Sequence, residues 1–96
     1  MLAERRRSTE TERLHRRRIE QYHTVFQGIS ARRPLPTTTA RTLLHELAGA
    51  ETHVPAAPKT LYRTAAAQWH PDLEDGDEVV FMLLQEAYRV VKLVSA

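Results

Sequence analysis

The residues of this chain best suited to chemistry are three consecutive ones, His70, Pro71 and Asp72. An aromatic residue precedes them, and Phe81 and Tyr88 follow them. Proline disfavours helical geometry at the residue before it, so Pro71 should end a helix at His70 and leave Asp72 exposed in a loop. An exposed histidine and carboxylate can bind a partner protein, whereas no set of residues in the sequence forms an active site. We therefore expect a non-enzymatic chain that acts through a partner.

Composition narrows the remaining possibilities for the 96 residues. Without cysteine the chain cannot form disulfides or a thiolate metal site, which fits a reducing compartment. No segment is apolar over the length that spans a bilayer, and the charged start lacks the apolar stretch of a signal peptide. We expect a cytoplasmic protein without membrane contact. We also expect no metal and no cofactor, because no two histidines have ligand spacing on one helix face. The histidines are His15, His23, His45, His53 and His70.

Charge divides the chain into two parts. Residues 1 to 33 hold nine arginines against four acidic residues, whereas residues 34 to 96 hold five basic and eight acidic residues. We therefore expect a basic helical arm over residues 1–36 and a helical domain over residues 37–96.

The arm should form one long helix from about Ala3 to Ala31, since it lacks proline and has no glycine before Gly28. Its first half, residues 4–18, offers only Leu14 to a core and should project into solvent or fray. Its second half should be packed. The apolar side of that half consists of Ile19, Tyr22, Phe26 and Ile29.

The arginine clusters of the arm allow three interpretations. They form a solvated helix face, a surface that neutralises nucleic-acid phosphates, or a surface that binds an acidic protein. Nucleic acid is possible but not favoured, because no aromatic residue interleaves the clusters to stack on bases and nearby glutamates dilute the charge. A coiled-coil dimer is disfavoured further, since its seam would cover only about two heptads. The clusters consist of Arg5, Arg6, Arg7, Arg16, Arg17 and Arg18.

Three helices are predicted in the domain, over residues 37–48, 58–69 and 77–94. Threonines at the start of the first can cap it, and Gly49 should stop it. Pro58 suits the first turn of the second. The third is so apolar that it needs two neighbours, which we expect to be the second helix and the packed half of the arm. The second helix should contribute a buried stripe of Leu61, Ala65 and Trp69.

A set of residues in this domain follows a pattern known from one family. It comprises the segments Leu61–Asp72, Gly76-Asp77 and Glu86–Tyr88, the apolar Phe81 and Leu84, and the earlier segment His45–Gly49. With these residues, positions 40 to 94 resemble the J-domain of DnaJ-type co-chaperones. The motif is specific, because a given tripeptide arises by chance at one position with a probability of about one in eight thousand and the flanking aromatic residues also fall in register.

The resemblance implies an antiparallel J-domain hairpin with the tripeptide at its tip. Together with the short preceding helix and the long arginine-rich N-terminal helix, and without a fourth J-domain helix, this predicts an all-α fold. The resemblance also implies docking on an ATP-bound DnaK-type (seventy-kilodalton heat-shock) chaperone and stimulation of its ATPase. Asp72 would accept a charge-assisted hydrogen bond from a partner arginine, while Pro71 stiffens the loop and His70 holds its geometry. By the same resemblance the docking face consists of Lys59, Tyr62 and Arg63.

The sequence departs from the family pattern in three respects, of which the first two predict weaker docking than usual. Thr60, Thr64 and Gln68 stand where family members often have basic residues. The loop over residues 73–76 is short and acidic, as in compact J-domains of small bacterial or viral proteins. Neither a glycine-rich linker nor a client-binding domain follows the hairpin, so a general holdase role is not expected.

Two functional classes remain open. The first is a co-chaperone that recruits the chaperone to a specific client or assembly through the basic arm. The second is a J-like structural or interaction module, viral or part of a larger complex, whose arm binds protein or nucleic acid. The complete tripeptide favours the first class, because a scaffold has no packing need for an exposed Asp72.

Overall fold

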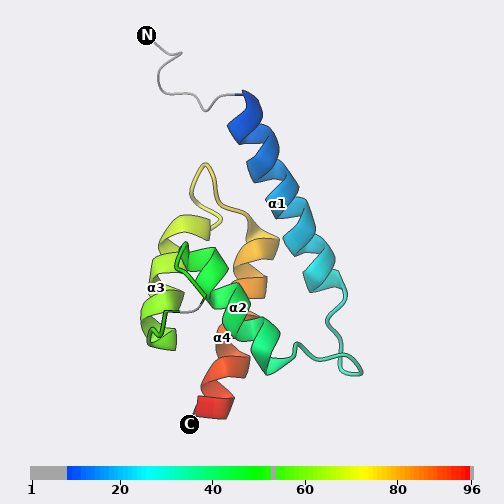
Figure 1. Ribbon diagram of the computed structural model, residues 1–96. Coiled ribbons are helices and arrows are strands. Elements are labelled where there is room, and N and C mark those ends of the chain that lie inside the picture. Colours follow the sequence, from blue (N-terminus) through cyan, green and yellow to red (C-terminus); the bar gives the residue numbers. More distant parts are fainter. Residues whose placement is uncertain (1–8, 53, 96) are drawn as a thin grey trace.

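The computed structural model describes residues 9–52 and 54–95, and this part of the chain forms four α-helices and no strand (Figure 1). The predicted all-helical class is thereby confirmed. Three arginines of the predicted arm, Arg5, Arg6 and Arg7, lie outside the described residues. The helices are α1 (Thr9–Gln27), α2 (Thr37–Ala48), α3 (Pro58–Trp69) and α4 (Glu78–Ser95).

The helix of the arm, α1, ends at Gln27 and so stops earlier than the predicted end at Ala31. The N–H of Gly28 bonds two carbonyl oxygens at once, 3.1 and 3.2 Å away, which tightens the last turn. Ser30 and Arg33 then exchange two backbone hydrogen bonds of 3.1 Å each. Residues 30–33 therefore form a turn and not a continuation of the helix, although the first proline of the chain comes only at position 34.

The ends of α2 show one wrong prediction and one confirmed one. Pro36 occupies the N-cap position without a side-chain hydrogen bond, so the predicted threonine cap is wrong; the carbonyl of Pro36 accepts the N–H of Ala40 at 2.8 Å. Gly49 stops the helix as predicted, with a φ of 75° that glycine adopts without strain. Pro58 begins α3, where its missing N–H costs no helical hydrogen bond.

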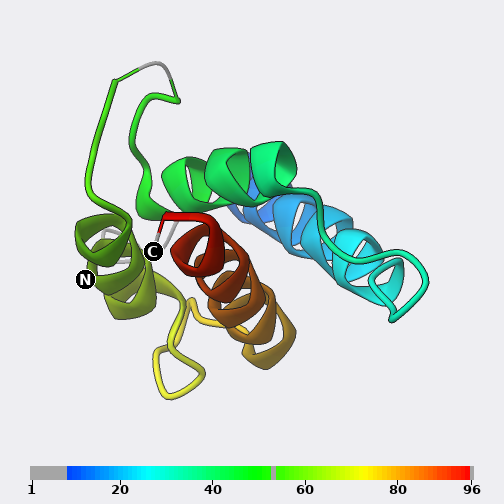
Figure 2. The same ribbon diagram turned by 90° about the horizontal axis from the view of Figure 1, so that it is seen from below.

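The core lies where α2, α3 and α4 meet (Figure 2). We predicted two neighbours for α4, but it has three, because α2 packs on it together with α1 and α3. The physical reason is the width of the apolar face of α2, which contacts α3 and α4 at once. The residues that α2 buries are Ala40, Leu43, Leu44, Leu47 and Ala48.

The helices α3 and α4 run antiparallel and are joined by residues 70–77, which we call the hairpin loop (Figure 1). α1 lies on a different side of α4 from α3 in both ribbon views (Figures 1 and 2). The predicted stripe of Leu61, Ala65 and Trp69 is confirmed as buried. Among the described helices, none combines the length and the hydropathy that crossing a bilayer requires.

The first half of α1 follows its prediction except at one residue, His15. We expected residues 4–18 to project from the domain, with Leu14 as their single apolar contribution. Leu14 is indeed 54 % exposed, but the neighbouring His15 reaches the end of α3 and stacks on Trp69. One aromatic contact therefore attaches α1 to the end of α3 at His15, whereas residues 9–14 are exposed.

Candidate docking site in the hairpin loop

Backbone hydrogen bonds close the hairpin loop at its base and again within it. The N–H of Asp77 donates to the carbonyl of Trp69 at 3.2 Å, which joins the end of α3 to the start of α4. Inside the loop, the N–H of Leu73 donates to the carbonyl of His70 at 2.9 Å, and the N–H of Gly76 to that of Leu73 at 3.0 Å. The loop is therefore folded on itself.

His70 directly follows the last residue of α3 and is fixed by two contacts. Its Nδ1 accepts the backbone N–H of Asp72 at 3.1 Å, and its ring meets Phe81 edge-on with 5.2 Å between centroids. A backbone N–H can only donate, so Nδ1 must be the unprotonated nitrogen in this arrangement. The imidazole therefore shapes the turn as a neutral acceptor.

Asp72 presents its carboxylate to solvent. The side chain is 89 % exposed, and Oδ2 lies 3.7 Å from Nδ1 of His70, beyond hydrogen-bond distance. Pro71, between the two, is exposed as well, and its ring restricts the backbone of the turn. The arrangement places the Asp72 carboxylate in solvent on a loop whose backbone is held.

The three residues of the expected docking face have different surroundings. Lys59 and Arg63 are exposed and one turn apart on α3, so they share a side of the helix. Tyr62 is half-buried and stacks on Tyr88 of α4, with 4.6 Å between ring centroids. The Lys92 ammonium lies 5.8 Å from the centre of the Tyr88 ring. Tyr62 therefore joins α3 to α4 with its ring.

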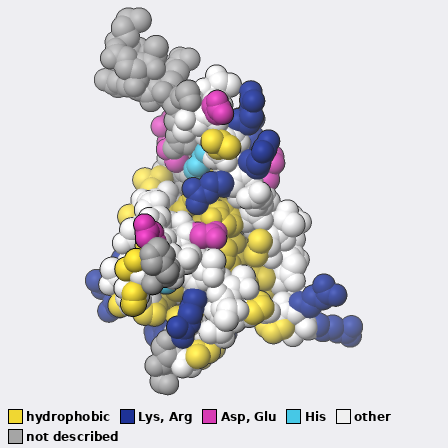
Figure 3. All heavy atoms as spheres, in the orientation of Figure 1, with side chains coloured by type: hydrophobic (Ala, Val, Ile, Leu, Met, Phe, Trp, Pro, Cys, Tyr) yellow, Lys and Arg dark blue, Asp and Glu magenta, His cyan; other side chains and the backbone are white. Residues whose placement is uncertain are grey.

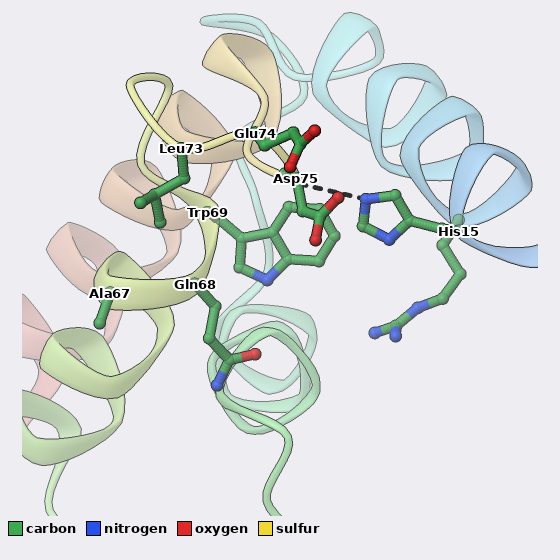
Figure 4. A pocket seen from close by; sticks show the side chains of 8 residues that line it. His15, Ala67, Gln68, Trp69, Leu73, Glu74 and Asp75 are labelled. Atoms are coloured by element: carbon green, nitrogen blue, oxygen red, sulfur yellow. Dashed lines mark hydrogen bonds between the residues drawn. The ribbon is translucent and has the colours of Figure 1, made fainter. Parts of the chain in front are cut away.

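Sequence reasoning missed two residues of α1 that contact the hairpin loop, His15 and His23. The ring of His15 stacks on Trp69 with 5.4 Å between centroids and an angle of 10°, and its Nε2 lies 3.1 Å from the carbonyl oxygen of Asp75 (Figure 4). Nε2 of His23 lies 2.6 Å from Oδ2 of Asp77. The two histidines are eight positions apart, a spacing that places them on one side of a helix and could have drawn attention to them.

Trp69 is the centre of an aromatic and polar cluster between α1, α2 and the hairpin loop. Its indole Nε1 donates to the carbonyl of Leu47 at 3.0 Å. Tyr22 meets the indole edge-on, 6.0 Å away, and the Arg18 guanidinium lies over both rings. Arg18 donates to the Tyr22 hydroxyl at 3.2 Å, which in turn donates to Oε1 of Glu46 at 3.1 Å. One arginine of the predicted binding arm is thus part of the packing.

We expect ionisation of Tyr22 to lower the free energy of unfolding at alkaline pH. Burial raises the pKa of Tyr22 above its ordinary value of about 10, against the effect of the Arg18 guanidinium, which lowers the pKa. The folded state then favours the neutral phenol. The contribution of this phenol to the free energy of unfolding is complete below pH 10 and is lost as pH rises through the folded pKa. Urea denaturation between about pH 9 and pH 11 should show a smaller fall in the free energy of unfolding for Tyr22→Phe than for the wild type. Parallel curves for the two proteins would contradict the prediction.

The other two arginines of the second cluster, Arg16 and Arg17, are exposed on α1. Figure 3 shows Lys and Arg side chains along the exposed side of α1, with acidic side chains close by. The charge on this surface is therefore mixed, as expected from the glutamates that interrupt the arginines. The outer side of α1 remains accessible to a partner.

Comparisons with protein-family models, with curated proteins and with solved structures find no match for this chain. Among the described residues, no group of three or more histidine or acidic side chains could hold a metal ion. What the site offers is a held loop with the exposed carboxylate of Asp72 beside His70, two exposed cations on α3 and a cluster that connects the loop to α1. Such a site can bind another protein.

Proposed function

We propose that this chain is a J-domain co-chaperone that docks on a DnaK-type chaperone through the hairpin loop and stimulates its ATPase. The observation that carries the proposal is the setting of Asp72: its carboxylate is exposed, while the preceding His70 is held by the Asp72 N–H and by Phe81. A carboxylate without a structural partner, on a loop built to present it, favours recognition over packing. The chain itself makes and breaks no bonds in this proposal.

The proposed contact is a charge-assisted hydrogen bond from an arginine of the chaperone to Asp72. Because the loop is closed by its own backbone hydrogen bonds, little conformational entropy is lost on docking. Lys59 and Arg63 would add long-range attraction to an acidic chaperone surface. Two cations form a small basic face, which agrees with the weaker docking predicted for this sequence.

The exposed Arg16 and Arg17 support a second role for α1, the recruitment of the chaperone to a specific client or complex subunit. An acidic protein surface suits these guanidinium groups, and nucleic acid is the less favoured ligand. The alternative function, a J-like interaction module without a chaperone, uses the same arginines but has no use for Asp72. The two functions therefore differ in what Asp72 does.

Single-turnover ATP hydrolysis by a DnaK-type chaperone tests the proposal directly. Asp72→Asn keeps the backbone N–H that binds His70 but removes the charge, and a hydrogen bond to a charged group contributes about 1.5 to 3 kcal/mol. We expect half-maximal stimulation to require a roughly ten- to hundredfold higher concentration of the Asp72→Asn variant than of the wild type. We expect a similar loss for His70→Gln, which removes the ring that holds the turn.

The matched control is Glu74→Gln, which removes one negative charge from the same loop and should stimulate like the wild type. Circular dichroism should show equal helix content in all four proteins. A wild type without stimulation, or an Asp72→Asn variant as active as the wild type, would reject the co-chaperone function.

A further inference from the structure

α1 contacts the hairpin loop at two places and the residue just before the loop at a third. Just before the loop, the ring of His15 covers Trp69, the last residue of α3. Near the end of the loop, the carbonyl oxygen of Asp75 lies 3.1 Å from Nε2 of His15, as the dashed line in Figure 4 shows. At the junction of the loop with α4, Asp77 contacts Nε2 of His23 at 2.6 Å. These contacts all come from one side of one helix.

Each histidine forms a hydrogen bond with an oxygen atom of the loop. A carbonyl oxygen only accepts hydrogen bonds, so Nε2 of His15 is the donor to Asp75. Oδ2 of Asp77 caps α4 by accepting the N–H of Val80 at 3.0 Å, and the imidazole of His23 beside it orients that carboxylate. The two contacts restrain the segment that carries the chain from the exposed tip back into α4.

We propose that α1 is a clamp on the hairpin loop, and that His15 and His23 are positioning residues that hold the loop in its docking conformation. The clamp acts on the loop whatever the loop binds; its effect on a chaperone rests on the proposed function. Neither histidine touches the chaperone in this proposal. They act through Trp69, the Asp75 carbonyl and Asp77.

The clamp connects the two surfaces that the molecule offers to partners. Arg16 and Arg17 follow His15 directly on α1, which is one continuous helix from Thr9 to Gln27. A partner that binds these arginines and favours the docked position of α1 would raise the fraction of molecules with an ordered loop. Linkage makes the effect reciprocal, so chaperone docking would also strengthen binding at α1.

The test compares His15→Ala and His23→Ala with Val91→Ala. Val91 is buried on α4 and lies fourteen positions from Asp77, about 20 Å along the helix, so its truncation lowers stability without touching the loop. We expect ¹⁵N relaxation to show greater mobility of residues 72–75 in both histidine variants and wild-type values in Val91→Ala. The fluorescence of Trp69, the one tryptophan of the chain, should change in His15→Ala, because the stacked ring is removed.

A conservative variant separates positioning from general stability. His23→Gln keeps a side-chain N–H near the position of Nε2 and should retain the ordered loop that His23→Ala loses. A loop equally ordered in the wild type and both alanine variants would overturn the clamp, as would equal mobility in Val91→Ala. These measurements need no chaperone.

The same variants in the ATPase assay test the functional consequence. We expect the concentration of the His15→Ala variant that gives half-maximal stimulation to be about fivefold that of the wild type, because fewer molecules have the competent loop. A wild type without stimulation would reject the proposed function and leave the relaxation result to decide on the clamp. A wild type that stimulates, with an unchanged concentration for His15→Ala, would overturn the proposed effect of the clamp on docking.

Discussion

Substitution of Gly76 by alanine is expected to displace the hairpin loop and to lower the free energy of unfolding by about 2 to 4 kcal/mol. An added Cβ would overlap the carbonyl oxygen of His70 and lie 2.8 Å from its carbonyl carbon and 3.0 Å from the oxygen of Trp69. These atoms belong to the backbone and cannot rotate away. Relief therefore requires the loop to move, at the expense of the hydrogen bond between the Asp77 N–H and Trp69.

Urea denaturation and single-turnover ATP hydrolysis measure the two consequences of Gly76→Ala, the loss of stability and the loss of stimulation. Gly28→Ala is the matched control, because its added Cβ would meet only carbonyl oxygens at ordinary distances of 3.5 and 3.8 Å. We expect Gly28→Ala to differ from the wild type by no more than about 0.5 kcal/mol. Equal stabilities of the two variants would show that the loop does not pack as described.

Removal of the Trp69 side chain should have the largest effect on stability. Trp69→Ala is expected to cost about 3 to 5 kcal/mol, a large part of the roughly 5 to 15 kcal/mol that stabilises a typical domain. The indole is 4 % exposed and contacts His15, Tyr22 and Arg18, and it bonds the carbonyl of Leu47. Its loss therefore weakens the attachment of α1 as well as the core.

One further variant isolates the hydrogen bond of the indole, and a surface variant serves as the control. Trp69→Phe keeps an aromatic ring but removes the donor to the Leu47 carbonyl, so we expect a smaller loss of about 1 to 3 kcal/mol. Leu93→Ala truncates a side chain that is 66 % exposed and should change stability by less than about 0.5 kcal/mol. Chemical denaturation followed by circular dichroism gives all three values. A Trp69→Ala variant as stable as Leu93→Ala would contradict the central place of the indole.

Much of the secondary structure follows from local sequence. Gly49 and Pro58 mark helix boundaries because each has a backbone property that acts within one turn. The buried stripe that ends at Trp69 follows from helical periodicity alone. The threonine cap of α2 was wrong, because the helix begins at Thr37 itself and the N-cap position falls on Pro36, which has no side-chain acceptor.

Only part of the candidate site could be predicted from the sequence. His70, Pro71 and Asp72 stand together in the chain, so their type and order could be read directly. His15 and His23 lie more than fifty residues from their partners in the loop, and their contacts depend on where α1 docks. Periodicity shows which side of a helix a residue occupies but not which surface that side meets.

The sequence by itself determined the helical class, most helix boundaries and the exposed tripeptide at the end of α3, because these depend on interactions within a few residues. Only the tertiary structure decided that α2 lies against both α3 and α4, and that α1 reaches the hairpin loop. These features depend on which apolar faces cover one another. The tripeptide, recognisable from sequence alone, is therefore presented by a loop whose position the rest of the fold sets.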